Sequence, residues 1–489
     1  MKNSHLVFVI VSVLVMSCLS IAAPETPTDM YEQYRTFSRI VATVDANYVD
    51  KVDREKLFYG AYEGMLQTLD PYSMFLPPQE KEDLEIETKG EFGGLGIEIT
   101  ADKNGVLTVI TPIEDTPAFK AGILAGDRIV RIEGKTTKGL SLQDAIKKLR
   151  GKKGTSVTVT VYHESGKLED ITVVRDIIKL ESVKDPHFVD DKYKIAYLRL
   201  TQFQENSAAS LDATVKKLQA DGMKALVLDV RFNPGGLLKS ATDIADRFLE
   251  GGVIVSTRGR ASGEQVVKAT KEGTYPNFPV AVLVSGRSAS AAEILAGAIQ
   301  DHKRGLIVGT RTFGKASVQS LIKLEDGKSA LRLTTAHYYT PSGRLIHHNP
   351  NNPDQKTWGI EPDIEVKTTL QDEIDLWEHW RQEHLKQVRE KNHAPTPDTP
   401  EAPEKLEKPE QPEVKDDKPA PKDVAPDADI EELVPDLDPG KGQAKAKEFR
   451  DTTLEAAVNA LKGMILAEER QAAAAPATPA PPVSAPVAK

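Results

Sequence analysis

The sequence is nearly devoid of cysteine, since its 489 residues include only one, Cys18. A single thiol excludes a disulfide framework within the chain and a cysteine-based metal site. Lysine and arginine form no dense basic cluster and the net charge is −10, so the sequence gives no indication of nucleic-acid binding. No spacing of histidine and carboxylate is typical of a zinc site either, and we expect no metal or other cofactor.

Long apolar runs are also lacking, except for one from Leu6 to Met16 at the N-terminus. A bilayer-spanning helix needs about 20 such residues, so this run is too short for an uncleaved membrane anchor, which is the alternative. The preceding Lys2 and the small residues that follow are typical of a secretory signal peptide. We predict that residues 1–23 are a signal peptide and that the protein is exported to the periplasm.

Cys18 lies within this signal, after Val15-Met16-Ser17. The four residues faintly resemble a lipoprotein cleavage box, although Met16 is bulky for a position that favours small residues. A lipid anchor at Cys18 is the only membrane association that the sequence suggests.

The next part of the chain divides into segments with different patterns of apolar and turn residues. Helical spacing, as in Tyr31, Tyr34 and Phe37, comes first. Short β-branched runs between glycine-rich turns follow, and then buried-type strands alternate with helices. We therefore predict a multidomain α/β protein with a helical N-terminal region at 29–90, a β-rich domain at 91–177, an α/β core at 178–370 and a helical extension at 371–390.

The C-terminal part has a different composition. Residues 391–445 are rich in proline and charge, which predicts a disordered linker. Helical spacing returns at 446–470, where Leu454, Val458 and Leu461 share an apolar face. An isolated helix is marginally stable, so this face needs a partner surface. Residues 471–489, rich in alanine and proline, are predicted to be a disordered tail.

A serine follows one buried-type strand at a turn of small residues, Ser288-Ala289-Ser290-Ala291-Ala292. Small residues allow a tight turn into a helix, where a hydroxyl meets backbone N–H groups and the positive end of the helix. Such a junction can stabilise an oxyanion. Taken alone, however, Ser290 is as well explained as an ordinary helix N-cap.

A lysine stands among apolar and small neighbours after a later strand, in Thr312-Phe313-Gly314-Lys315-Ala316. Burial would lower the pKa of Lys315, and a neutral lysine can accept a proton from serine. The alternative is an exposed lysine without a catalytic role.

Together the two segments resemble the C-terminal processing, or tail-specific, proteases, whose hallmark is a Ser-Ala-Ser-Ala-Ser-Glu-like run followed by Thr-Phe-Gly-Lys and a glutamine. The resemblance implies that Ser290 is the nucleophile and Lys315 the general base, and that Gln319, one helical turn beyond, positions the lysine. Ala292 stands where the family has serine. Activity is expected to rise with pH as Lys315 loses its proton, and to survive chelators.

The resemblance extends over residues 30–370 and includes a glycine motif after a strand, Arg231-Phe232-Asn233-Pro234-Gly235-Gly236. It implies an oxyanion hole formed by Gly235 or Gly236 together with Ala291. A purely structural turn is the alternative for the glycines.

The β-rich domain resembles a PDZ module. Gly93-Gly94-Leu95-Gly96-Ile97 is similar to its carboxylate-binding loop, which implies that Gly94, Leu95, Gly96 and Ile97 hold the C-terminus of a peptide that adds as a strand. The helix that carries Ile146 would form a wall of the groove. The expected partners are therefore protein or peptide substrates bound by their C-termini.

Three other interpretations remain open from sequence. Gly309 to Ala316 is one residue short of a phosphate-binding loop and lacks its final hydroxyl. A histidine could assist the serine, the candidates being His302, His337, His347 and His348. The chain could also be a non-catalytic PDZ peptide-binding scaffold. Unpaired apolar faces of the terminal helices further suggest a homo-oligomer or an adaptor protein.

Overall fold

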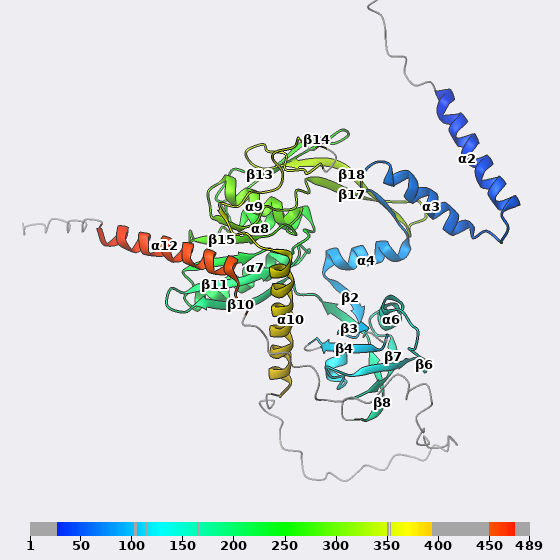
Figure 1. Cartoon of the computed structure of the whole chain (residues 1–489), viewed down its shortest axis with the longest axis horizontal. Coiled ribbons are helices and arrows are strands. Elements are labelled where there is room, and N and C mark those ends of the chain that lie inside the picture. Colours follow the sequence, from blue (N-terminus) through cyan, green and yellow to red (C-terminus); the bar gives the residue numbers. More distant parts are fainter. Residues whose placement is uncertain are drawn as a thin grey trace, which may run out of the picture. The chain divides into compact units, whose positions relative to one another are not determined.

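We describe the chain from a computed structural model that covers residues 27–101, 105–113, 116–163, 166–349, 352, 354–393 and 449–474 (Figure 1). The predicted signal peptide with Cys18, nearly all of the predicted linker and most of the predicted tail lie outside these residues. The chain forms two compact units, residues 1–78 with 319–334 and residues 79–318 with 335–489. Among the described residues, no helix is both long and apolar enough to cross a membrane.

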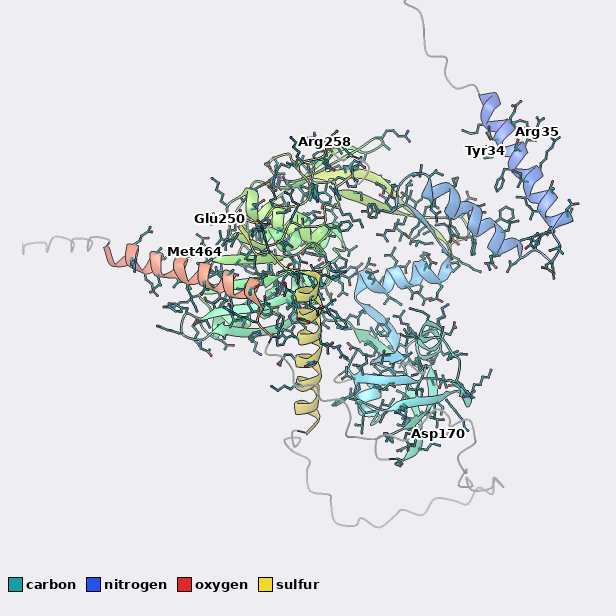
Figure 2. The ribbon with its side chains drawn as sticks, viewed as in Figure 1. Tyr34, Arg35, Asp170, Glu250, Arg258 and Met464 are labelled. Carbon is teal, nitrogen blue, oxygen red and sulfur yellow. The ribbon has the colours of Figure 1, made fainter. Side chains whose placement is uncertain are left out.

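The first unit is mainly helical, with α2 (Pro27–Asn47), α3 (Arg54–Gln67) and the short strand β1 (Met74–Leu76). The ring of Phe75 is buried against Tyr59 and Tyr62 of α3, at centroid distances of 4.9 and 5.1 Å. β1 pairs antiparallel with residues 330–332 of β18 (Ala330–Tyr339). The aromatic side chains of α2 are exposed, among them Tyr34 (Figure 2).

The second unit begins with α4 (Pro78–Lys89) and a β-rich domain. The sheet of this domain has the strand order β3-β4-β5-β7-β8, with β6 paired to β5, while β2 pairs with β9. Alternate residues of its strands, such as Val157, Val159 and Val161, point into one core. The elements are β2 (Glu91–Gly94), β3 (Ile97–Ala101), β4 (Leu107–Pro112), α5 (Pro117–Lys120), β5 (Arg128–Ile132), β6 (Lys135–Thr136), α6 (Leu142–Leu149), β7 (Ser156–Tyr162), β8 (Leu168–Val174) and β9 (Asp176–Lys179).

The α/β core is built on a six-stranded sheet of order β10-β11-β12-β15-β16-β19. All neighbours in it are parallel except β10 and β11. Its elements are β10 (Val183–Asp190), β11 (Ile195–Leu200), α7 (Ser207–Ala220), β12 (Ala225–Asp229), α8 (Leu238–Asp246), β15 (Val280–Val284), α9 (Ala291–Asp301), β16 (Leu306–Gly309) and β19 (Ile364–Glu365). A separate sheet contains β13 (Val253–Gly259), β14 (Gly263–Lys268) and β17 (Ser317–Lys323), and β13 pairs with the end of β18.

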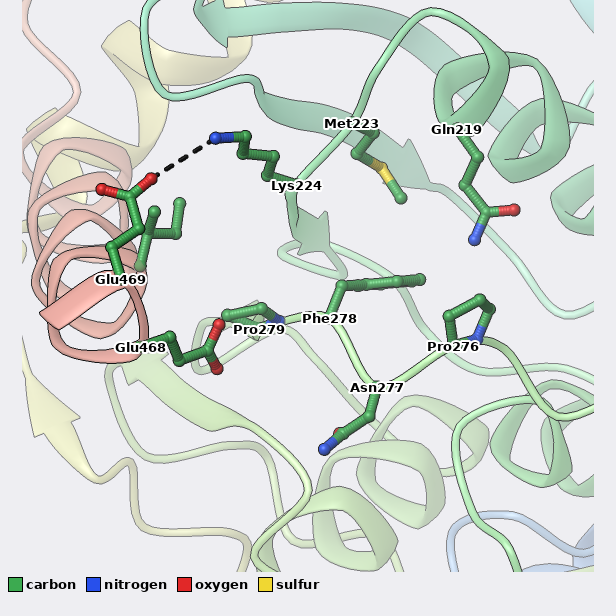
Figure 3. A pocket seen from close by; sticks show the side chains of 10 residues that line it. Gln219, Met223, Lys224, Pro276, Asn277, Phe278, Pro279, Glu468 and Glu469 are labelled. Carbon is green, nitrogen blue, oxygen red and sulfur yellow. Dashed lines mark hydrogen bonds and ion pairs between the residues drawn. The ribbon is translucent and has the colours of Figure 1, made fainter. Parts of the chain in front are cut away.

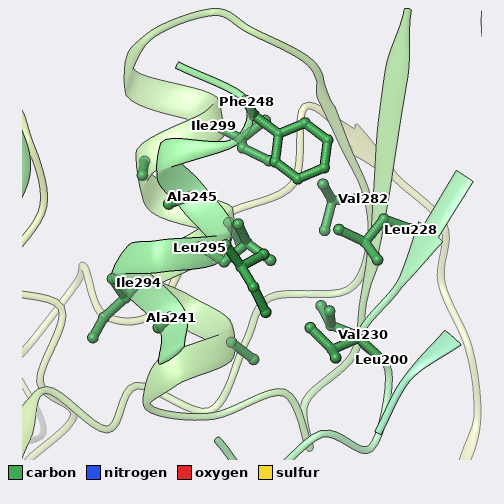
Figure 4. Close-up of a cluster of buried hydrophobic side chains, with 14 of the residues drawn as sticks. Leu200, Leu228, Val230, Ala241, Ala245, Phe248, Val282, Ile294, Leu295 and Ile299 are labelled. Carbon is green, nitrogen blue, oxygen red and sulfur yellow. The ribbon is translucent and has the colours of Figure 1, made fainter. Parts of the chain in front are cut away.

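Both faces of this sheet are buried, which explains why its strands are apolar throughout. Leu228 and Val282 pack on one face against α7, α8 and α9, with Leu295 at the centre (Figure 4). Val227 and Leu283 point to the other face.

The second face is covered by the C-terminal helix α12 (Thr452–Ala474). Its residues Ala457, Val458, Leu461 and Ile465 pack on alternate residues of four strands. The apolar stripe predicted from sequence therefore has its partner within the same chain, and the helix begins and ends a few residues later than predicted. A further helix, α10 (Leu370–His393), follows β19 in sequence.

A pocket of about 590 Å³ lies at the amino ends of β12 and β15. Its lining includes Met223, Phe278 and Glu468, and an ion pair between Lys224 and Glu469 stands at its margin (Figure 3). The candidate catalytic residues follow the carboxyl ends of the same strands. This pocket is therefore remote from them.

Candidate active site

Three loops meet at the carboxyl edge of the parallel sheet, where α/β proteins usually bind their ligands. They follow β12, β15 and β16, and carry the glycine motif, Ser290 and Lys315 in that order. Neighbouring parallel strands bring their following loops to one edge, although the loops are distant in sequence.

Ser290 has a backbone conformation that an ordinary N-cap does not require. Its φ and ψ are 56° and −114°, whereas Ser141, the N-cap of α6, has −67° and 152°. Non-glycine residues seldom adopt the former conformation, and its cost of roughly 1–3 kcal/mol is typical of functional turns. The half-buried Ser290 thus lies on a strained turn between β15 and α9, as nucleophiles of many α/β hydrolases do.

The carboxylate of Glu293 joins the serine loop to the lysine loop. Its Oε2 accepts hydrogen bonds from the backbone N–H groups of Ser290 and Lys315, each at 2.8 Å. Its Oε1 accepts from the hydroxyl of Thr312 at 2.5 Å and from the N–H of Gly314 at 2.6 Å. Because both backbone nitrogens donate to the same oxygen, the nitrogens of Ser290 and Lys315 are separated by at most twice the length of these hydrogen bonds.

Glu293 is fully buried, with an exposed fraction of 0%. Burial raises the pKa of its carboxyl, while the hydrogen bonds from Thr312 and from the backbone of Lys315, Gly314 and Ser290 oppose that rise. The four donors therefore stabilise the ionised form in a site where water cannot.

Tyr338, at the buried end of β18, makes a second connection. Its hydroxyl lies 2.7 Å from the carbonyl oxygen of Lys315 and 3.0 Å from that of Ser290. Burial, with a smaller effect from the charge of Glu293, holds the pKa of Tyr338 well above its usual range, so the hydroxyl stays a donor. The structure thus brings the backbones of Ser290 and Lys315 together through two buried side chains.

The glycine motif is fixed by Asn233, which is fully buried. The Asn233 side chain donates to the carbonyl of Leu200 at 2.7 Å and accepts from the N–H of Gly235 at 2.8 Å. Its backbone carbonyl accepts from the N–H of Ala289 at 3.0 Å, which ties this loop to the serine loop.

These contacts distinguish the two glycines as oxyanion donors. The N–H of Gly235 is engaged by Asn233. Within the described residues, the N–H groups of Gly236 and of Ala291, the first residue of α9, have no hydrogen-bond acceptor. Gly236 and Ala291 are therefore the pair available to a ligand.

Gly235 is needed because no side chain fits there. Its φ is +108°, and a Cβ would lie 2.8 Å from the Cβ of Ser290 and 2.9 Å from the carbonyl oxygen of Ala289. Gly235→Ala is expected to shift the loop and so displace the neighbouring Gly236 N–H. The expected fall in kcat is on the order of 10²-fold, the usual effect of losing an oxyanion donor. Gly251→Ala is the matched control, because its Cβ meets nothing within 4 Å. Steady-state kinetics measures kcat for both variants, and an equal loss of kcat in the two would contradict the role of Gly235 in shaping the loop.

Gln319 is not one helical turn beyond Lys315, and that prediction is wrong. Residues Ser317–Lys323 form the strand β17, which pairs with β18. Gln319 belongs to the first unit, where its amide donates to Thr334 Oγ1 at 3.3 Å, and Thr334 Oγ1 donates to Asp70 at 3.2 Å. Whether Gln319 orients Lys315 stays a prediction.

The phosphate-loop interpretation fails on topology. A phosphate-binding loop leads from a strand into a helix, but here Lys315 is followed by β17. Lys315 itself is half-buried.

The histidines considered as partners of Ser290 contact other residues. His302 ends α9, about 16 Å of helix from Ser290, and its ring bonds to the carbonyl of Val253 at 2.7 Å. His337 and His347 lie side by side with ring centroids 5.2 Å apart, and His348 stacks on Trp358. In the described part of the chain, no hydrogen bond or ring contact joins a histidine to Ser290.

The candidate peptide-binding residues lie at an edge of the β-rich domain. β3 is the terminal strand of its sheet, so a peptide can add beside it. Leu95 is buried and Gly96 has φ +81°, where a Cβ would clash with Thr116 at 2.3 Å. Gly94 ends β2 and Ile97 begins β3.

The helix α6 contacts β3, as a groove wall should. Ala145 and Leu149 are buried in the domain core, whereas Ile146 is half-buried. Ile146, like the half-buried Leu142, therefore has surface left for a ligand.

Parts of the chain match known protein families. Residues 194–366 match peptidase family S41, residues 93–174 match the PDZ domain, and residues 19–79 match the activating protease CtpB N-terminal domain. The carboxy-terminal-processing protease of Bartonella bacilliformis is 42% identical over 401 residues, which are 79% of this chain and 89% of that protein. The carboxy-terminal processing protease CtpA of Bacillus subtilis is 34% identical over 315 residues, 64% of this chain and 66% of that protein.

Among solved structures, the photosystem II D1 C-terminal processing protease is 31% identical and covers 68% of this chain and 92% of its own, with a TM-score of 0.39. The family matches and the relatives in sequence together define a serine-type peptidase that carries a PDZ domain. The chain belongs to peptidase family S41 and is a C-terminal processing peptidase. The predicted family and the predicted fold class, a multidomain α/β protein with a PDZ domain and a helical N-terminus, are confirmed.

Neither Glu293 nor Tyr338 is among the site residues predicted from the sequence. The sequence does contain a signal for Glu293, because a serine three residues before a glutamate at the start of a helix is a capping-box pattern. Tyr338 had none, because its position depends on the pairing of β13 with β18.

Proposed function

We propose that this peptidase cleaves exported proteins near their C-termini with a Ser290/Lys315 dyad. The observation that carries the proposal is the shared anchoring of the two backbones by Glu293 and Tyr338. No histidine takes part, since Lys315 supplies the base. A scaffold without activity would have no need for a strained serine and two unengaged N–H groups at one edge.

In the first half of the reaction, neutral Lys315 takes the proton of the Ser290 hydroxyl while Oγ attacks the carbonyl carbon of the scissile peptide bond. The N–H groups of Gly236 and Ala291 stabilise the oxyanion. The C–N bond then breaks, and the leaving amine takes the proton from the Lys315 ammonium. An acyl-serine remains.

In the second half, water gives a proton to Lys315 and its oxygen attacks the acyl carbon. The intermediate collapses as the proton returns to Ser290 Oγ, which releases the new C-terminal carboxylate. Gln319 is proposed to orient Lys315 in both halves. No other reactant is required by this sequence of steps.

Substrate choice is assigned to the PDZ domain, with the loop from Gly94 to Ile97 as the carboxylate-binding element and Ile146 in the groove. A substrate with an amidated C-terminus should lose charge-assisted hydrogen bonds worth about 1.5–3 kcal/mol, and so bind roughly tenfold to a hundredfold more weakly. The measurement is cleavage of one substrate with free and with amidated C-terminus by the wild type and by Ile146→Glu. The wild type should prefer the free carboxylate and the variant should not. Equal cleavage of both substrates by the wild type would refute carboxylate capture.

The protein is further proposed to act in the periplasm, with residues 1–23 as its signal peptide. We take the PDZ domain as residues 91–177 and the protease core as residues 178–370. The helical extension then covers 371–390, the linker 391–445 and the final helix 446–470. N-terminal sequencing of protein from a periplasmic extract tests the export. Recovery of a chain that still begins at Met1 would contradict it. A lipid anchor at Cys18 and self-association or an adaptor remain hypotheses that mass spectrometry and sedimentation can test.

A further inference from the structure

A buried arginine in the glycine motif is held by two carboxylates from distant parts of the chain. Arg231 is 5% exposed, and its Nε and Nη2 donate to Asp229, at the end of β12, at 3.0 and 2.6 Å. Its Nη1 and Nη2 also donate to Asp451, 220 residues away, at 2.9 and 2.7 Å. Asp451 immediately precedes α12.

In this cluster one guanidinium lies between two carboxylates. Burial alone would lower the pKa of Arg231, but the charges and hydrogen bonds of Asp229 and Asp451 outweigh burial and hold that pKa well above its usual range. Tyr197 donates its hydroxyl to Asp229 at 2.8 Å. Removal of one carboxylate would leave buried guanidinium N–H groups without their acceptor, and an uncompensated buried donor is costly.

Arg231 lies at the start of the loop that carries the oxyanion glycines. Its own N–H donates to Asp229 at 2.9 Å, and the N–H of Asn233 donates to the carbonyl of Val230 at 3.2 Å. Asn233 in turn fixes Gly235 through its side chain. A short stretch of backbone, held by these hydrogen bonds, thus connects the guanidinium to the glycines.

The C-terminal helix crosses the sheet from edge to edge. Asp451 stands at the carboxyl edge beside Arg231, while Glu469, near the other end of α12, pairs with Lys224 at the amino edge. Midway, Lys462 pairs with Asp190 of β10 at 2.7 Å. Of these three ion pairs, only that of Asp451 reaches a catalytic loop.

We propose that Asp451 is a positioning residue for the oxyanion hole, so that docking of α12 completes the active site from beyond the linker. The inference rests on the proposed function of Gly236 and Ala291. Asp451 touches no substrate. It acts through Arg231, which holds the loop in the shape that directs the Gly236 N–H toward the reacting carbonyl.

The test is Asp451→Ser in the full-length protein. Asp451 is also the N-cap of α12, since its carboxylate accepts from the N–H of Leu454 at 3.0 Å. Serine caps helices about as well as aspartate, so this variant keeps the cap and removes the partner of Arg231. We expect kcat to fall about tenfold to a hundredfold with KM nearly unchanged, because transition-state stabilisation and not substrate binding is impaired.

Lys462→Gln is the matched control, because it breaks an ion pair of the same helix that is distant from the loop. It should lower Tm without changing kcat. Equal kcat losses in the two variants, or an Asp451→Ser variant with lower Tm and unchanged kcat, would overturn the proposal. If Asp451→Ser does not fold, Asp451→Asn is measured instead, since asparagine keeps one hydrogen-bond acceptor but loses the charge that pairs with Arg231. An unchanged kcat in Asp451→Asn would equally overturn the proposal. Activity of Ser290→Ala would instead refute the proposed dyad, which keeps the two failures distinct.

Discussion

Replacement of Ser290 or Lys315 by alanine is expected to abolish peptide-bond cleavage, with a loss of kcat/KM on the order of 10⁴-fold or more. Each variant removes one half of a unit that transfers a proton and forms a bond. Lys315→Arg should be equally inactive, because arginine stays charged and cannot accept the serine proton. Turnover of a protein substrate, followed with circular dichroism to verify the fold, provides the measurement.

Lys239→Ala is the control for the lysine, because the Lys239 side chain is 83% exposed and, among the described residues, pairs only with Asp243 on α8. It should leave activity unchanged. Substantial turnover by Lys315→Ala, with its fold intact, would show that another group is the base. His337, His347 and His348 would then be the next candidates.

Glu293→Gln is expected to lower kcat on the order of 10²-fold, although Glu293 takes no part in the chemistry. The carboxylate accepts four hydrogen bonds, two on each oxygen. A glutamine has one carbonyl oxygen, so in either orientation its NH₂ group would face two donors. The backbones of Ser290 and Lys315 would move apart, and displacements of about 1 Å can have an effect of this size.

The control is Glu250→Gln, the same chemical change at a side chain that is 71% exposed and pairs with Lys271. The comparison needs kcat, KM and the thermal midpoint of each variant. Wild-type kcat in a folded Glu293→Gln protein would mean that the carboxylate does not hold the dyad together.

From the sequence, the family motif predicts Ser290 and Lys315 as the dyad, and this remains a prediction. The buried strands could be predicted because their apolar runs require two covered faces. The sequence did not reveal how the loops are joined. Glu293 at a helix start could equally have been an exposed capping residue, and only the tertiary fold surrounds it with donors from the lysine loop.

Gln319 shows how a local assumption failed. A spacing of four residues suggests one helical turn, but the stretch after Lys315 pairs with β18 and is extended. The surface on which α12 packs could also not be predicted from local sequence patterns. Its apolar face predicted that a partner exists, whereas the identity of that partner depends on a sheet whose first three strands precede α12 by more than 200 residues. The 220-residue separation of Arg231 and Asp451 illustrates this distance.

The most direct test of the account is labelling of the nucleophile by a serine-directed phosphonate, with the modified peptide located by mass spectrometry. A single adduct on Ser290 is expected in the wild type. A folded Lys315→Ala variant should be labelled very slowly or not at all, because the hydroxyl is nucleophilic only when Lys315 takes its proton. An adduct on another residue, or labelling of Ser290 at the same rate without Lys315, would contradict the Ser290/Lys315 dyad.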